Sequence, residues 1–96
     1  LKVLPGSHLT EFSPSSFDPD LFFRTDSEEN KEFLRGELQI TLNAGDVFLF
    51  HSRLLHAANR NRGDETKLSL VFTYYDESNS PKKGTRSDNL PPIKVR

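Results

Sequence analysis

The sequence predicts a mainly β fold. Three observations carry this prediction: residues 37–42 alternate apolar and polar side chains, residues 67–75 alternate again, and the turn signal Gly45-Asp46 precedes a short apolar run at residues 47–50. Alternation with a period of two is typical of a strand with one buried face, and a Gly-Asp pair marks a tight turn. We therefore expect strands joined by turns and loops, with little helix.

The first part of the chain contains one short strand and a long excursion. Residues 1–4 form a strand candidate that ends at Pro5-Gly6. Residues 9–30 mix Ser, Pro, Asp and aromatic residues without a sustained period, which is typical of a functional lid or of a partly disordered loop. Residues 27–35 predict one short helix, with Ser27 as its cap and Gly36 as its stop.

The predicted strand at residues 67–75 has two unlike faces. One face is bulky and apolar, and the other is mixed and mostly small or polar. The bulky face consists of Leu68, Leu70, Phe72 and Tyr74. A barrel that encloses a wet active site has this asymmetry, and so does a sheet with one face in solvent. Residues 76–96 are polar and rich in Pro, Ser and Lys, and we expect an extended tail there.

The length of the chain limits it to one small domain. Its 96 residues bury roughly 60–65% of the unfolded surface on folding, so a core is possible but thin. The chain has no Met, even at position 1, and its opening residues 1–4 read as the middle of a strand. We therefore expect a piece of a longer chain.

Charge and composition exclude several classes of partner. Thirteen basic and fourteen acidic residues give a net charge of −1, and the basic residues form no block with interleaved aromatics, so nucleic-acid binding is not expected. The longest apolar run, residues 47–50, is far too short to span a bilayer, so no membrane partner is expected either. The chain has no cysteine, which excludes disulfides and thiolate metal sites and is compatible with a reducing compartment. We expect a cytoplasmic location.

The histidines are the candidate functional residues. His56 closes an extended stretch beside a polar loop, where an imidazole is well placed to bind a metal; the alternative is a packed or surface histidine. His51 lies five residues earlier, and alternation along one strand would put it on the opposite face, so we assign it a structural or supporting role. Arg53 and Arg86 could meet an acidic substrate, but exposed Arg is common and solvation is the simpler interpretation.

The segment Val3-Leu4-Pro5-Gly6-Ser7-His8 and the region of residues 43–75 together resemble the C-terminal part of the phytanoyl-CoA dioxygenase family of Fe(II)/2-oxoglutarate-dependent oxygenases. The resemblance covers roughly residues 1–75 and is most specific at Pro5 to His8, Gly45 to His56, Asn61 and Lys67. It implies that residues 1–75 are the C-terminal portion of a double-stranded β-helix, the jelly-roll or cupin-like barrel, here only partial.

The resemblance also assigns roles to single residues. His56 corresponds to the distal metal-binding His of the family, and Lys67, eleven positions later, to the basic residue that pairs with the far carboxylate of 2-oxoglutarate. If the strands holding His56 and Lys67 pair antiparallel, their side chains could face one cavity. His8 corresponds to a family histidine near the pocket mouth and is a candidate for substrate contact; the alternative is a turn histidine. Asn61 corresponds to a loop asparagine that we interpret as a turn-former.

Three departures from the family pattern are visible. The family usually has Arg where this chain has Lys67, and Gly-Ser where it has Ala57-Ala58. The second change removes one hydrogen bond to the co-substrate, worth about 0.5–1.5 kcal/mol. The chain also contains no His-x-Asp or His-x-Glu, the pair that completes the iron site with the distal His, so we expect that pair upstream. By itself the chain is expected to be inactive.

The predicted function is that of the family. The chain is expected to be a fragment of an Fe(II)/2-oxoglutarate-dependent dioxygenase that hydroxylates a small organic substrate, with Fe(II) as cofactor and 2-oxoglutarate as co-substrate. The alternative is a cupin-like, non-catalytic binding or scaffold module. Ala57-Ala58 and the missing carboxylate ligand favour the alternative, and the spacing between His56 and Lys67 favours the enzyme. Motifs of serine hydrolases, phosphate-binding loops and zinc proteases are absent from the sequence.

Overall fold

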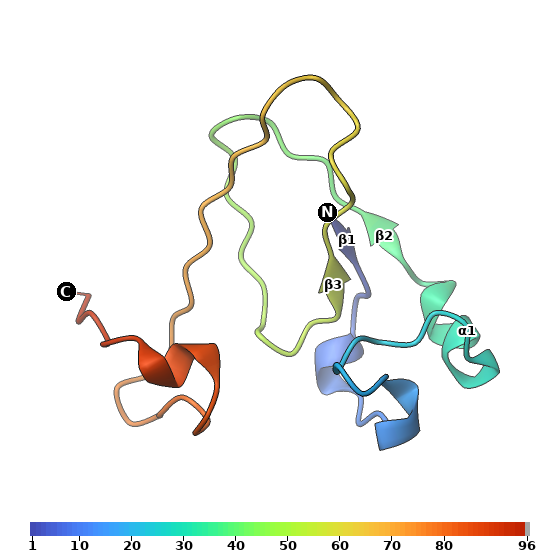
Figure 1. Cartoon of the computed structure of the whole chain (residues 1–96), viewed down its shortest axis with the longest axis horizontal. Coiled ribbons are helices and arrows are strands. Elements are labelled where there is room, and N and C mark those ends of the chain that lie inside the picture. The colour runs from blue at the N-terminus through green and yellow to red at the C-terminus, as the bar shows by residue number, and fades with distance from the viewer. Residues whose placement is uncertain (96) are drawn as a thin grey trace.

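The computed structural model describes residues 1–95. At its centre lies a three-stranded antiparallel sheet with the strand order β2-β1-β3, which Figure 1 shows. The strands are β1 (Lys2–Val3), β2 (Leu38–Gln39) and β3 (His56–Ala57). In the central strand, Val3 lies opposite Leu38 on one side and opposite His56 on the other. The predicted β fold is thus present in part, as a small antiparallel sheet, and most of the described chain is loop.

Backbone hydrogen bonds extend the pairing beyond these short strands. The Leu1 carbonyl accepts from the Ile40 N–H at 2.7 Å, and the Leu1 amino group donates to the Ile40 carbonyl at 3.2 Å. On the other edge, the Leu4 N–H donates to the Leu55 carbonyl at 3.0 Å. The strand predicted at residues 1–4 is therefore confirmed, and Gly6, with a φ of 82°, ends it in the left-handed region that glycine adopts freely.

The described residues form no closed barrel. The sequence places strands at residues 47–50 and 67–75, and both predictions are wrong for this structure; the strand predicted at residues 37–42 shrinks to β2. In Figure 1 both segments run as long loops away from the sheet. A strand is held by hydrogen bonds to a neighbouring strand. Neither residues 47–50 nor residues 67–75 have such a neighbour among the described residues. The exposed apolar side chains of these segments include Val47, Leu49, Leu68, Leu70 and Val71.

The predicted helix is present as α1 (Glu28–Leu34). Ser27 occupies the N-cap position, but its side chain makes no capping hydrogen bond; its carbonyl accepts from the N–H groups of Asn30 and Lys31 instead. The helix stops before Gly36, whose N–H bonds back to the Phe33 carbonyl at 3.0 Å. Ser27 and Gly36 thus flank the helix as the sequence predicts, and only the side-chain hydrogen bond expected of the cap is missing. The other helical elements are single 3₁₀ turns: η1 (Ser7–Leu9), η2 (Pro14–Ser16) and η3 (Arg86–Asn89).

Residues 9–30 pack into a small unit around a buried amide. Asn30 is fully buried, and its Nδ2 donates to the Ser16 carbonyl at 2.9 Å and to the Arg24 carbonyl at 2.8 Å. The unit also has an aromatic centre. Around the Phe12 ring lie those of Phe33, Phe23 and Phe17, at centroid distances of 4.9, 5.1 and 6.2 Å. The excursion is thus an organised segment in this structure.

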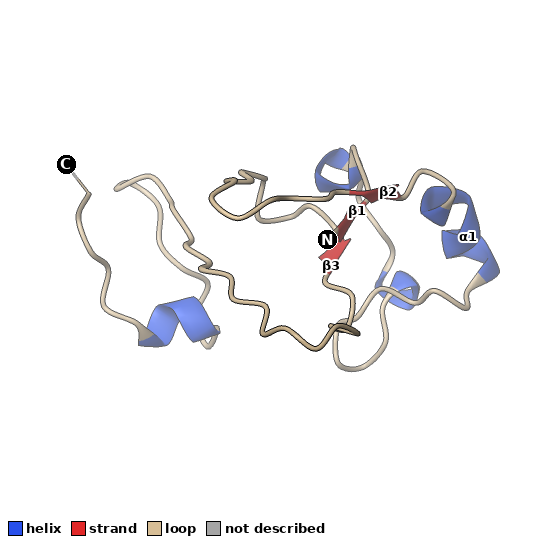
Figure 2. Cartoon of the chain, turned by 90° about the horizontal axis from the view of Figure 1, so that it is seen from above, coloured by secondary structure: helices blue, strands red, loops and turns tan. Residues whose placement is uncertain are grey.

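The hydrophobic core is small. Val3 and Leu4 are the buried apolar residues of the described chain, and they belong to the central strand or follow it directly. The tail from residue 76 is almost entirely exposed, and Figures 1 and 2 show its helical turn η3 well away from the sheet. Arg96, the last residue of the predicted tail, lies outside the described residues. Of the helices in residues 1–95, none combines the length and apolarity that a bilayer crossing requires.

Candidate functional site

His56 is the first residue of β3 and has an exposed side chain. Pairing with β1 fixes its backbone, since Val3 lies directly opposite. The ring of Phe50 approaches the imidazole edge to face, with ring centroids 4.8 Å apart and an interplanar angle of 61°. The sheet register and one aromatic neighbour therefore define where this imidazole lies.

A hydrogen bond to a carbonyl identifies which ring nitrogen of His56 carries the proton. Its Nδ1 lies 2.7 Å from the Leu54 carbonyl oxygen. A carbonyl only accepts hydrogen bonds, so Nδ1 is the donor, and in the neutral ring the lone pair is on Nε2. Metal-binding histidines commonly have this arrangement, in which one nitrogen donates to a carbonyl and the other binds the metal. His56 therefore offers a free Nε2 donor.

His51 has the opposite arrangement. Its Nδ1 accepts a hydrogen bond from the Arg53 backbone N–H at 3.1 Å. A backbone N–H only donates, so the Nδ1 lone pair is used, and the proton of the neutral ring is on Nε2. A metal would have to displace a hydrogen bond to bind His51. The supporting role predicted for His51 is consistent with this geometry.

His8 lies in η1, directly after the end of β1, and its ring is 5.4 Å from that of His51. Its Nδ1 is buried and has no hydrogen-bond partner among the described residues. The neighbouring Ser7 is bonded through its Oγ to the Leu55 N–H at 2.8 Å. The structure thus joins the Pro-Gly-Ser-His segment to the loop between His51 and His56. Substrate contact by His8 stays a prediction.

An apolar groove lies beside His56, between the sheet and the packed segment that follows η1. It is lined by residues at the ends of β1 and β3 and by aromatic residues of that segment. The residues on these two sides include Leu4, Leu54, Leu55, His56, Phe12, Phe17 and Phe23. Arg53, Lys2 and Glu37 contribute the charged groups, and Lys2 pairs with Glu37 at 2.6 Å. The groove could hold an apolar molecule next to the His56 ring.

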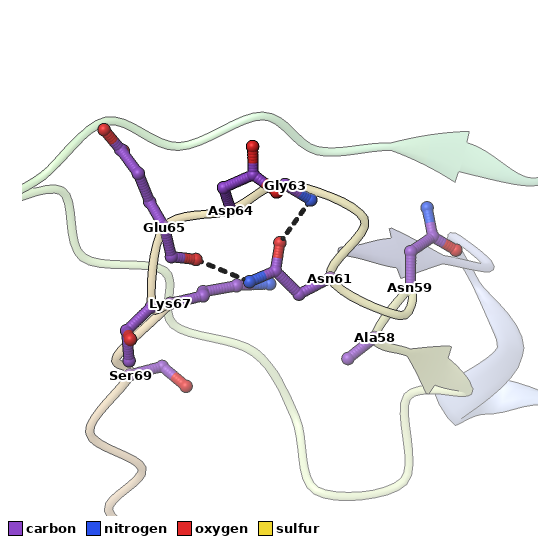
Figure 3. Close-up of a pocket in the computed structure, with 9 residues that line it drawn as sticks. Ala58, Asn59, Asn61, Gly63, Asp64, Glu65, Lys67 and Ser69 are labelled. Carbon is purple, nitrogen blue, oxygen red and sulfur yellow. Dashed lines mark hydrogen bonds between the residues drawn. The ribbon is translucent and has the colours of Figure 1, made fainter.

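Lys67 lies in a separate concavity, formed by the loop that follows β3 (Figure 3). Asn61 organises this loop: its Oδ1 accepts from the Gly63 N–H at 3.1 Å, and its Nδ2 donates to the Glu65 carbonyl at 2.7 Å. The turn-forming role predicted for Asn61 is confirmed. His56 does not line this concavity.

The expected cross-strand pair of His56 and Lys67 is therefore wrong for this structure. The strand β3 pairs with β1, and residues 67–75 pair with no strand among the described residues. The physical reason is the same as for the missing barrel, because the segment lacks a neighbour that would hold it in register with β3. The role of Lys67 in binding the co-substrate stays a prediction.

The donor set for iron is incomplete in this part of the chain. Non-haem Fe(II) oxygenases commonly use two His and one carboxylate on one face of the metal. In residues 1–95 no three His, Cys, Asp or Glu side chains come together as a metal site. His56 fits one of the three positions through its Nε2.

A comparison with protein families gives one match. The family model described as phytanoyl-CoA dioxygenase (PhyH) matches residues 1–69. The chain belongs to the phytanoyl-CoA dioxygenase family. The match includes Ser7, His8, His56 and Lys67, and it ends six residues before the limit of the resemblance seen in the sequence. The comparisons with curated proteins and with solved structures gave no match.

Membership of the phytanoyl-CoA dioxygenase family implies a double-stranded β-helix and Fe(II)/2-oxoglutarate chemistry. Sequence reasoning missed Ser7, which reaches the loop before His56. The sequence signal that could have identified Ser7 is its position between Pro5-Gly6 and His8, within a motif of the family.

Proposed function

We propose that the chain is the C-terminal part of an Fe(II)/2-oxoglutarate-dependent dioxygenase that hydroxylates a small organic substrate. Family membership supports the reaction class. The observation that carries the proposal is the hydrogen bond from His56 Nδ1 to the Leu54 carbonyl, because it leaves Nε2 free for a metal. In this proposal His56 is one of three protein ligands, and a His-x-Asp or His-x-Glu pair in the preceding part of the enzyme supplies the other two.

Lys67 is the proposed anchor of the co-substrate. Its ammonium group would pair with the far carboxylate of 2-oxoglutarate, with one charge and without the two-pronged geometry of Arg. For this, residues 67–75 would have to pair with strands from the rest of the enzyme, which would bring Lys67 to the cavity that His56 faces. The alternation of residues 67–75 and their exposed apolar side chains support this pairing.

In this proposal the residues that line the groove bind the substrate and shield it from water. The apolar groove beside His56 would hold the substrate and exclude water, with Phe12, Phe17 and Phe23 among the residues that line it. When bound, iron and 2-oxoglutarate would supply the oxidising chemistry with molecular oxygen as the oxidant: one oxygen atom enters the succinate formed, with carbon dioxide, from the co-substrate, and the other enters the hydroxylated substrate. The protein contributes position, charge and a dry surface.

A second candidate function is a cupin-like module that binds a ligand or a partner without catalysis. Ala57-Ala58 favours it, because β3 then lacks the hydroxyl that members of the family often offer to the co-substrate. The two candidates differ in whether the intact protein binds Fe(II) and 2-oxoglutarate together.

Spectroscopy of the intact protein under anaerobic conditions distinguishes them. With Fe(II) and 2-oxoglutarate, the enzyme should show the weak visible charge-transfer band of an iron-bound keto acid. His56→Ala should abolish the band, and His51→Ala, the matched control, should keep it. A band that persists in His56→Ala and vanishes in His51→Ala would show that the wrong ligand was chosen. An intact protein that never shows the band would favour the binding module.

A further inference from the structure

Ser7 and His56 are hydrogen-bonded to opposite sides of the same peptide group. The peptide joins Leu54 to Leu55: its carbonyl accepts from His56 Nδ1 at 2.7 Å, and its N–H donates to Ser7 Oγ at 2.8 Å. A peptide group is planar and rigid, so the positions of its two partners are coupled. The hydroxyl of Ser7 is thereby linked to the imidazole of His56 through one fixed unit.

Ser7 is a firm anchor for this peptide. Its side chain is buried, with the residue only 6% exposed, and it starts the turn η1 directly after Gly6. Ser7 and Leu55 are 48 residues apart in the sequence, so the bond ties two distant segments together. The Leu55 carbonyl is also fixed, because it accepts from the Leu4 N–H at 3.0 Å. The backbone on both sides of Leu55 is therefore held by residues 4–7.

We propose that Ser7 is a positioning residue for His56. By accepting from the Leu55 N–H, its hydroxyl sets the orientation of the Leu54 carbonyl, and that carbonyl keeps the His56 proton on Nδ1 and the ring in one orientation. Hydrogen bonds in such a chain polarise one another, which strengthens each by roughly 10–30%. The lone pair on Nε2 then points in a fixed direction. The link to iron binding rests on the proposed function, whereas the effect on the ring does not.

The chemistry at position 7 is specific. Alanine would leave the partly buried Leu55 N–H without its acceptor, and the peptide could then rotate. Threonine keeps the hydroxyl, and cysteine nearly keeps the volume but offers only a weak acceptor. Comparing Ser, Thr, Cys and Ala at position 7 therefore separates the effect of the hydrogen-bond acceptor from the effect of side-chain packing.

The test measures the tautomer of His56 in the intact, metal-free protein. With ¹⁵N-labelled histidine, the ring nitrogen shifts report which nitrogen carries the proton, and His56→Ala assigns the signals. The measurement is made at a pH where the ring is neutral. Wild type should show the Nδ1-protonated form. In Ser7→Ala the ratio of this form to the Nε2-protonated form should fall by about fivefold, the equilibrium effect of one typical hydrogen bond.

Matched variants control for general disruption of the turn. Thr10→Ala removes a hydroxyl that bonds the Gly6 carbonyl in the same turn and does not reach the Leu54–Leu55 peptide, so the tautomer should not change. Ser7→Thr should restore the wild-type ratio. If Ser7→Ala does not fold, Ser7→Cys replaces it, with a smaller fall in the ratio expected. A wild-type tautomer ratio in a folded Ser7→Ala or Ser7→Cys variant would overturn the proposal.

Iron titration of the same variants separates this inference from the proposed function. If Ser7→Ala changes the tautomer but the intact protein binds no Fe(II), the positioning role stands and the enzyme assignment fails. If the intact protein binds Fe(II) and the tautomer does not depend on Ser7, the enzyme assignment stands and the positioning role fails. If the tautomer depends on Ser7 and the intact protein binds Fe(II), Ser7→Ala should bind Fe(II) more weakly than wild type does, and Thr10→Ala should bind it as wild type does.

Discussion

The ring of Phe50 lies edge to face against the imidazole of His56, with centroids 4.8 Å apart. Such a contact contributes about 0.5–1.5 kcal/mol beyond the area it buries. Because the other side of His56 is open, Phe50 limits the motion of the ring. We predict that Phe50→Ala weakens Fe(II) binding by the intact protein about two- to tenfold. Phe50→Tyr, which keeps the ring, should bind iron as wild type does; equal affinities for all three proteins would remove Phe50 from the site.

The charge of Lys67 is expected to matter for the co-substrate and not for the fold. In the intact protein, Lys67→Ala should weaken 2-oxoglutarate binding by about 1.5–3 kcal/mol, the usual range for hydrogen bonds to charged groups. Lys67→Arg should be tolerated better, since it keeps the charge and adds a second donor. The concentration dependence of 2-oxoglutarate consumption measures both variants. An unchanged dependence in Lys67→Ala would make Lys67 an ordinary loop lysine.

The buried amide of Asn30 is expected to hold the segment from η2 to α1 together. Asn30→Ala removes the donor to the Arg24 carbonyl, at a cost of about 1–3 kcal/mol for a carbonyl left without its partner, while the Ser16 carbonyl keeps the Arg24 N–H at 2.9 Å. Denaturant unfolding of the intact protein measures the loss. The matched control is Asn89→Ala, which also removes an amide bonded to a carbonyl, but on the surface, and should change stability by less than about 1 kcal/mol.

The carboxylate of Asp76 is expected to titrate below its ordinary range. The Ser78 hydroxyl, and secondarily the Ser78 backbone N–H, donate to Asp76 Oδ1 and lower the pKa of this exposed group. A lowered pKa stabilises the turn above the unfolded pKa, and the contribution is lost as the pH falls through the folded pKa. Ser78→Ala should raise the pKa of Asp76 toward its ordinary value, as followed by NMR titration of the carboxyl carbon. An unchanged pKa would mean that the backbone bond alone is responsible.

The 96-residue chain by itself is expected to be inactive and prone to self-association. In the proposed function it offers one of the three protein ligands of the iron, and no group of three such side chains is present in residues 1–95; its apolar loops are also exposed. Incubation with Fe(II), ascorbate and 2-oxoglutarate should yield no succinate, and light scattering should detect oligomers. Succinate production by this chain would show that the missing ligands were wrongly placed upstream.

Local signals in the sequence predicted the local structure well. Pro5-Gly6 ended the first strand, residues 27–35 formed the helix, and Asn61 organised its loop, because in each case residues close in sequence make the contacts. The strand predicted at residues 67–75 is absent because a strand needs a partner that is distant in sequence. Alternation shows that a segment is suited to a sheet, but it does not supply the neighbouring strand.

The candidate site was predictable in part. A sequence motif identified His56 as a candidate. Its tautomer, however, depends on the Leu54 carbonyl, and the orientation of that carbonyl depends on Ser7, which lies 48 residues before Leu55. No pattern along the chain encodes that link. The packing of Phe12 against Phe33 was not predicted either, because the apolar residues of residues 9–30 follow no regular spacing that would indicate a buried face.

The central place of β1 in the sheet has a consequence for the order in which the chain is made. Of the three strands β1 is synthesised first, and both of its partners come much later: on one side Leu1 bonds to Ile40, 39 positions on, and on the other side Leu4 bonds to Leu55. Until β3 has left the ribosome, the backbone groups of Lys2 and Val3 lack one or both neighbours, and the Leu54–Leu55 peptide has no anchor. Assembly of the site around His56 is therefore a late event, limited by the closure of long loops rather than by the formation of the helix.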